Sequence, residues 1–123
     1  AEDMANITQH CLEEKVNFGK STLNELQIML ETATGMAEQV AKALENNDAD
    51  LARESLNAEV RIDQNYEVFR QENVERLKNG TYSVVASVYF LDFLTKFEKM
   101  GDHLTNIAQG IMKVQSEIAK RET

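Results

Sequence analysis

Apolar residues recur at the spacing of an α-helix along almost the whole chain. The pattern predicts three long helices, over about residues 4–44, 49–78 and 84–119. The clearest apolar stripe of the first helix consists of Leu26, Leu30, Ala33, Ala37, Val40 and Leu44. Gly19 either breaks this helix or merely weakens it, because an interior glycine costs about 1 kcal/mol relative to alanine.

Two short breaks separate the predicted helices. The first covers residues 46–48, and the second is centred on Gly80, which supplies the left-handed conformation common just after a helix. The residues that can cap the following helices are Asn47, Asp48, Thr81 and Ser83. Short connections place consecutive helices antiparallel. We therefore expect an all-α fold with a single domain over residues 1–123, an elongated antiparallel three-helix bundle.

Composition supports this fold class and narrows the function. The chain has 123 residues, no proline and five glycines, which suits long helices with few connections. Its 21 Asp and Glu against 13 Lys and Arg give a net charge of −8, which argues against a nucleic-acid partner. No apolar stretch is long enough to span a membrane. Cys11 is the single cysteine, so no internal disulfide is expected.

Charged side chains fall at positions that the helical pattern assigns to the core. In the second helix, one stripe consists of Ala52, Leu56, Glu59, Asp63, Tyr66, Arg70 and Leu77. In the third, Glu98 and Asp102 run beside the apolar stripe Phe90, Leu94, Phe97, Gly101, Leu104, Ala108 and Ile111. A buried charge without a partner is costly, so these carboxylates need a counter-charge or a metal.

The carboxylates form two pairs with the same spacing, Glu59-x-x-x-Asp63 and Glu98-x-x-x-Asp102. Residues four apart lie on one face of a helix, about one turn from each other. Asp63 and Glu98 lie 17 and 18 residues from Gly80, and Glu59 and Asp102 lie 21 and 22 from it. In an antiparallel hairpin both pairs therefore reach the same height. Four converging carboxylates predict a site for a cation such as iron, manganese, magnesium or calcium.

A simpler interpretation of the acidic pairs stays open. A chain with 21 carboxylates contains several i,i+4 pairs by chance, and Asp63 with Glu67 is one of them. Arg70 could neutralise Asp63, or Tyr66 could donate a hydrogen bond. The carboxylates would then be a solvated or salt-bridged face without metal.

Other chemistry finds little support. A ferritin-like di-iron site needs Glu-x-x-His pairs, but neither His10 nor His103 has a glutamate three residues before it. His10 with Cys11 is too sparse for a zinc site. No nucleophile–base arrangement and no phosphate-cradling glycine loop is present. We therefore expect a protein that is not an enzyme.

The last predicted helix contains the run FEKMGDHLTNIA, residues 97–108, which resembles the signature of the PhoU family, with Lys99 and Met100 in place of the usual Arg and Ile. Residues 59–63, EVRID, are similar to the earlier acidic motif of that family. The resemblance covers about residues 23–115, one three-helix repeat. It implies a helical bundle that can hold multinuclear iron or other metals. Carried over to this chain, it implies the ligands Glu59, Asp63, Glu98 and Asp102. His103 and Asn106 also match the motif, and a structural role is left open for them.

The resemblance also implies a function. PhoU proteins contain two repeats and negatively regulate phosphate uptake, whereas a single repeat occurs as the cytoplasmic C-terminal domain of sodium/phosphate cotransporter family proteins. This chain has one repeat and starts without methionine, which favours such a domain on the cytoplasmic side of the plasma membrane. The expected partners are a second copy of the chain, the membrane portion of the same parent protein, or phosphate-signalling proteins. The rival interpretation is a structural interaction bundle that binds no metal.

Overall fold

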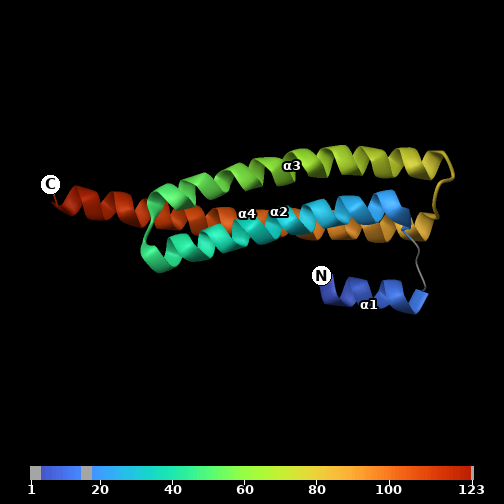
Figure 1. Cartoon of the computed structure of the whole chain (residues 1–123), viewed down its shortest axis with the longest axis horizontal. Coiled ribbons are helices and arrows are strands. Elements are labelled where there is room, and N and C mark those ends of the chain that lie inside the picture. Colours follow the sequence, from blue (N-terminus) through green and yellow to red (C-terminus); the bar gives the residue numbers. More distant parts are fainter. Residues whose placement is uncertain (1–3, 15–17, 123) are drawn as a thin grey trace.

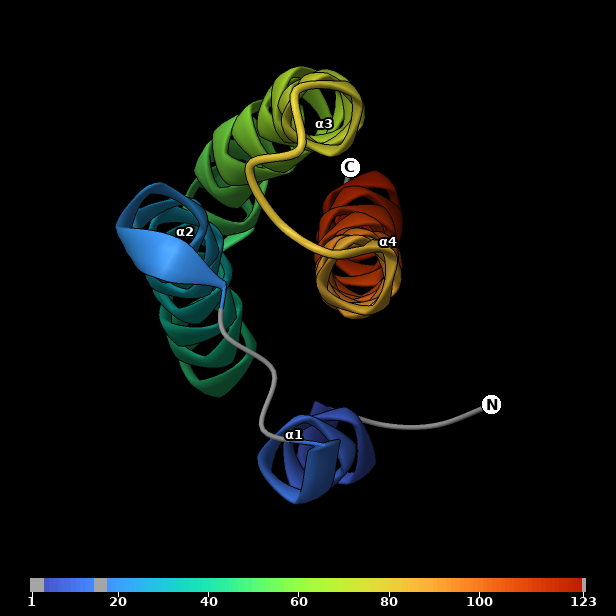
Figure 2. The ribbon, with the colours of Figure 1, turned by 90° about the vertical axis from the view of Figure 1, so that its right-hand side faces the viewer.

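A computed structural model describes residues 4–14 and 18–122, with only the backbone for residues 10–14. Its helices are α1 (Met4–Glu14), α2 (Gly19–Asn46), α3 (Ala49–Lys78) and α4 (Val84–Glu122). Figure 1 shows α2, α3 and α4 running side by side as an elongated bundle, with α4 continuing past the α2–α3 turn. Figure 2 shows these three helices at the corners of a triangle, with α1 set apart from α3. The predicted all-α bundle is confirmed, and the first predicted helix is broken before Gly19.

The turns form where the sequence places them. Asn47 ends α2 in the left-handed conformation with φ 50°, and the side chain of Asp48 caps α3 by accepting a hydrogen bond from the backbone N–H of Leu51 at 3.0 Å. Gly80 has φ 70°, a conformation that disfavours residues with a Cβ. Ser83 caps α4, since its Oγ accepts a hydrogen bond from the N–H of Ala86 at 3.1 Å.

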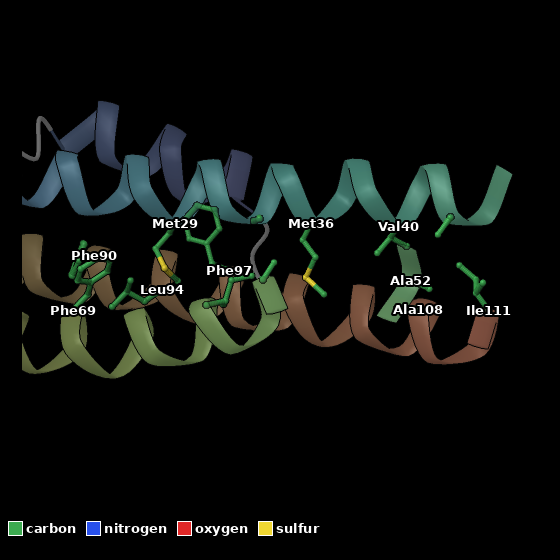
Figure 3. Packing of buried hydrophobic residues seen from close by; sticks show 14 residues of the cluster. Met29, Met36, Val40, Ala52, Phe69, Phe90, Leu94, Phe97, Ala108 and Ile111 are labelled. Carbon is green, nitrogen blue, oxygen red and sulfur yellow. The ribbon is translucent and has the colours of Figure 1, made fainter. Parts of the chain in front are cut away.

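A continuous apolar core fills the space between α2, α3 and α4 (Figure 3). Methionines and small residues of α2 meet a row of large side chains from α4. The α4 part of this core, which includes Phe90, Leu94, Phe97, Ala108 and Ile111, follows the predicted stripe. Among the described residues, no helix is long and apolar enough to cross a membrane.

The predicted core stripe of α2 was partly wrong. Leu30 and Leu44 are 47% and 59% exposed, whereas the polar Thr22 and Glu25 are buried. The buried face of α2 consists of Thr22, Glu25, Met29, Ala33, Met36, Val40 and Ala43. The apolar pattern alone pointed to a neighbouring face, because it could not include buried polar residues.

The predicted stripe of α3 was also displaced. Its buried residues are Ala52, Ser55, Ala58, Ile62, Phe69 and Asn73. The small ones allow α3 to approach its neighbours closely, and the side-chain amide of Asn73 donates a hydrogen bond to Ser87 Oγ on α4 at 2.9 Å. Asp63 is exposed and Leu77 is 38% exposed, so neither belongs to the core.

A buried ion pair joins α2 to α3 near the end where α2 begins. Arg76 Nη1 donates to Glu25 Oε1 at 2.9 Å and to Thr22 Oγ1 at 3.1 Å, and Nη2 pairs with Glu25 Oε2. Burial raises the pKa of Glu25 to about 7, with Arg76 opposing the rise and Glu72 adding to it. The guanidinium carbon also lies 6.0 Å from the centre of the Phe90 ring. This pair was not predicted from the sequence.

Candidate metal centre

The four predicted carboxylates lie along the boundary between α3 and α4. Glu59 and Asp63 belong to α3, and Glu98 and Asp102 belong to the antiparallel α4. The two glutamates are half-buried and the two aspartates are exposed. The pairs therefore occupy the margin of the helix interface, and not the core stripe that the sequence suggested for α3.

The structure brings each of the two glutamates into electrostatic reach of the other three carboxylates. Glu98 lies within hydrogen-bonding reach of Asp63 and also experiences the charges of Glu59 and Asp102. Glu59 in turn experiences the charges of Asp63 and Asp102. The convergence follows from the matched distances of the pairs from Gly80. Their role as metal ligands stays a prediction.

Burial and mutual repulsion disfavour the charged forms of both glutamates. Burial is the largest cause that raises the pKa of Glu98 from its usual 4.5 to about 7, followed by the contact with Asp63. Burial also raises the pKa of Glu59, with further increases from Asp63 and Asp102, while the nearby hydroxyl of Thr105 opposes the shift. The cluster thus holds more negative charge than this environment stabilises in the absence of a cation.

Gly101 creates the space in which the Glu59 carboxylate lies. A Cβ added at Gly101 would overlap Oε2 of Glu59 and would lie 3.5 Å from its Cδ and 3.4 Å from Cδ1 of Ile62. The missing side chain on α4 therefore lets the α3 carboxylate approach the α4 backbone. Glu59 Oε2 is buried there without a hydrogen-bond partner, as is Thr105 Oγ1. The sequence placed Gly101 only in the core stripe and the motif; its position inside a helix, where glycine is unfavourable, was the available signal.

These residues fit a bound cation. The hydroxyl of Thr105 lowers the pKa of Glu59, but a positive charge stabilises a buried carboxylate more strongly, and none of the ion pairs in the described part of the chain involves any of the four carboxylates. Oxygen ligands suit magnesium, calcium, manganese and iron. As the side chains stand, no three His, Cys, Asp or Glu residues in the described ranges are arranged to hold an ion. Binding therefore requires the carboxylates to rotate toward a common centre.

The alternative partners of the cluster do not pair with it. Arg70 Nη2 donates to Glu67 Oε2 at 2.9 Å, so the structure pairs Arg70 with Glu67 and not with Asp63, the pairing that the sequence left open. Tyr66 packs against the apolar core. His103 and Asn106 are exposed on α4. The side chains of His10 and Cys11 lie outside what the structure describes.

The raised pKa values predict an unusual dependence of stability on pH. With a chelator present, the free energy of unfolding should fall as the pH rises from 5.5 to 8, because the folded state holds protons that the unfolded state releases above pH 4.5. Glu98→Gln should raise stability at pH 8 by about 1–2 kcal/mol, after allowance for solvent screening. Urea unfolding at both pH values measures this.

Glu117→Gln, an exposed position on the same helix, is the matched control and should leave the pH profile unchanged. Stability that rises between pH 5.5 and 8, or a Glu98→Gln profile identical to that of the parent, would contradict the raised pKa of Glu98.

Comparison with known proteins adds to this geometry. The PhoU domain model matches residues 26–111. A relative, the phosphate-specific transport system accessory protein PhoU homolog 1 of Thermotoga maritima, is 27% identical over 114 residues, which cover 90% of this chain and 48% of the relative. The chain thus spans about half the length of the curated relative it matches. No solved structure matches the chain.

Proposed function

Since this chain belongs to the PhoU domain family, we propose that it is a non-enzymatic regulatory module of phosphate homeostasis that binds metal. The name of the Thermotoga maritima relative, an accessory protein of phosphate-specific transport, supports the link to phosphate. The observation that carries the metal site is the buried oxygen of Glu59, which lies without a direct hydrogen bond against Gly101, in a side chain that interacts electrostatically with Asp63, Asp102 and Glu98.

The ligands of this proposal are Glu59, Asp63, Glu98 and Asp102. A cation bound among them would supply the positive charge that the cluster lacks and would hold α3 to α4 through residues of both helices. The family resemblance makes iron in a multinuclear centre the first choice, and carboxylate ligands equally suit the alternatives manganese, magnesium or calcium. The protons on Glu98 and Glu59 compete with metal, so affinity should fall as the pH drops below 7.

We further propose that the module acts on a sodium-dependent phosphate transporter from the cytoplasmic side of the plasma membrane. The support is the family and the match to about half of a relative. Phosphate uptake should change when cells that express such a transporter also express this module. Unchanged uptake, with expression of both proteins verified, would contradict the transporter link. It would not affect the metal proposal, which has a separate test.

A second candidate is an interaction bundle without metal. The observation that favours it is the lack, among the described residues, of three ligand side chains already arranged around one point. It predicts that metals leave the stability of the protein unchanged.

Metal binding should raise the stability of the folded protein. Iron(II), manganese or magnesium at about 100 times its dissociation constant should stabilise it by about 2–3 kcal/mol, because the ligands are assembled only when the chain is folded. Thermal melting measures this shift, and elemental analysis of protein purified without chelator measures the content. Glu98→Gln and Asp102→Asn should abolish both.

Two controls make the test specific. Glu117→Gln and Asp92→Asn change exposed carboxylates of the same helix outside the cluster, so they should keep metal content and melting shift. If Glu98→Gln and Asp102→Asn bind metal like the parent and like the two controls, Glu98 and Asp102 are not the ligands. If no metal shifts the parent protein, the metal-free bundle is the better description.

A further inference from the structure

The hydroxyl of Thr105 on α4 does not make the hydrogen bond that a helical threonine commonly makes. Threonines inside helices often donate to the carbonyl oxygen four residues before them. Thr8, Thr32 and Thr95 do so at 2.8, 2.8 and 3.0 Å. Oγ1 of Thr105 is buried but makes no such bond to Gly101, the residue four positions before it. The backbone of its own helix therefore does not satisfy this hydroxyl.

The Glu59 carboxylate of α3 is the acceptor within reach of Thr105. Oε2 of Glu59 lies against the α4 backbone at Gly101, about one helical turn before Thr105 on the same face. Burial raises the pKa of Glu59, and the Thr105 hydroxyl opposes that rise. Oε2 of Glu59 and Oγ1 of Thr105 are both buried without a direct hydrogen bond. A donor and an acceptor that each lack a partner thus lie close together across the interface of the two helices.

A hydrogen bond between these two oxygens would satisfy both of them. A buried polar atom that lacks a partner is costly, and a hydrogen bond to a charged oxygen is stronger than one to a neutral oxygen. The two side chains already interact. Rotation of the Thr105 hydroxyl or of the Glu59 carboxylate is therefore enough to form the bond, without movement of either helix.

The two oxygens of the Glu59 carboxylate have different surroundings. Only Oε2 overlaps the position of a Cβ at Gly101, and the carboxylate carbon lies 3.5 Å from that position, so Oε1 is directed away from it. Glu59 interacts electrostatically with Asp63 and Asp102, and Glu98 with Glu59. Once Oε2 is held in the space beside Gly101, Oε1 is the oxygen that Glu59 can offer to a cation.

We propose that Thr105 is a positioning residue of the acidic cluster, whose hydroxyl donates a hydrogen bond to Oε2 of Glu59 and leaves Oε1 as the one oxygen of Glu59 available to a cation. This inference rests on the metal site proposed above. It adds a residue that orients a ligand and does not itself touch the cation. Groups that hold a metal ligand in this way contribute strongly to metal affinity.

The number of oxygens that Glu59 offers affects which cations bind. Calcium takes about six to eight oxygen ligands in flexible geometry and often binds both oxygens of one carboxylate. Manganese suits an octahedral site of oxygen ligands, in which one oxygen from each carboxylate is enough. With Oε2 held by Thr105, the cluster should favour manganese. Without the hydroxyl, Oε2 is released and the preference for manganese over calcium should fall.

Isothermal titration calorimetry of the whole chain with manganese and with calcium, each ion alone, tests the proposal. Thr105→Val keeps the branched shape of the side chain and removes the hydroxyl. It should weaken manganese binding about tenfold and leave calcium binding within about twofold, because the released Oε2 can bind calcium. Thr105→Ser keeps the hydroxyl and should keep the parent's ratio of the two dissociation constants.

Thr95→Val is the matched control. Thr95 is also half-buried on α4, but its hydroxyl donates to its own helix at 3.0 Å, so this variant should bind both ions like the parent. A merely structural role of Thr105 would weaken both ions alike in Thr105→Val, and that result would overturn the proposal.

The remaining outcomes separate this inference from the metal site itself. A parent that binds neither ion would contradict the metal site and this inference with it. A parent that binds both ions, with the same ratio of dissociation constants in Thr105→Val, would overturn the role of Thr105 alone. The same conclusion would follow if Thr105→Ser lost the parent's ratio to the same extent as Thr105→Val.

Discussion

Replacing Arg76 with alanine is expected to lower the free energy of unfolding by about 3 kcal/mol at pH 8. The guanidinium makes two hydrogen bonds to Glu25 and a further one to Glu72 at 3.2 Å. The side chains of Arg76 and Glu25 are only 15% and 8% exposed. Without the arginine, the Glu25 carboxylate would remain buried with a second carboxylate near it and no counter-charge.

The loss should be smaller at pH 5.5. The pKa of Glu25 is already raised to about 7 with the arginine in place, and Arg76 opposes that rise. Removing Arg76 raises the pKa further, so the carboxyl takes up a proton at pH 5.5 and escapes most of the cost of a buried charge. Urea unfolding of the variant at both pH values measures the difference.

Arg70→Ala is the matched control. Arg70 also pairs with a glutamate on α3, but both side chains are largely exposed, at 43% and 64%. An exposed pair of this kind contributes little to stability, because solvent screens it. A double variant, Glu25→Met with Arg76→Met, removes both charges and should recover most of the stability. Equal losses for Arg76→Ala and Arg70→Ala would show that the buried pair carries no special weight.

The helices and turns were predictable because they depend on local chemistry. The absence of proline, the polar breaks near Asp48 and Gly80, and the helical spacing of apolar residues determine where each helix begins and ends. These signals lie within a few residues of the structure that they specify. Even the break between α1 and α2 has a local sign in the sequence, because Gly19 is a glycine inside the predicted helix.

Which face of each helix is buried was less predictable, because burial depends on partners distant in sequence. Leu30 and Leu44 are apolar but exposed, whereas Glu25 is charged but buried. Arg76, on another helix, reaches Glu25 and stabilises its charged form in the buried position. A pattern that counts apolar residues assigns both kinds of position wrongly.

The candidate site likewise has one part that the sequence predicts and one part that it does not. The equal distances of the two acidic pairs from Gly80 predicted that Glu59, Asp63, Glu98 and Asp102 would meet, since a hairpin conserves register. The contact of the Glu59 carboxylate with the backbone at Gly101 depends on the distance between two helices. The spacing of the two motifs does not determine that distance. The sequence therefore identified the residues of the cluster but not the space beside Gly101 that holds the Glu59 carboxylate.

Replacing Gly101 with alanine should separate metal binding from folding. The added Cβ would overlap Oε2 of Glu59, the flexible end of a side chain, so the carboxylate can move aside at little cost. Alanine also favours the helix by about 1 kcal/mol relative to glycine. The free energy of unfolding of the metal-free protein should therefore change by about 1 kcal/mol or less.

Metal affinity should nevertheless fall by about 100-fold. The displaced carboxylate can no longer reach a centre that it shares with Asp63, Glu98 and Asp102, and small displacements of a ligand are costly in metal sites. Isothermal titration calorimetry with manganese measures the metal affinity. Urea unfolding in the presence of a chelator measures the stability of the same variant.

Gly35→Ala is the matched control for this substitution. Gly35 also lies inside a helix, and a Cβ added there meets no atom within 4 Å. This variant should gain about 1 kcal/mol from helix propensity and bind metal like the parent. Both substitutions add one methyl group to a helical glycine; the overlap with Glu59 is the main difference, since the other neighbour of the added Cβ at Gly101, Cδ1 of Ile62, lies at 3.4 Å. Equal metal affinity in the two variants would show that metal binding by Glu59 does not depend on the space beside Gly101.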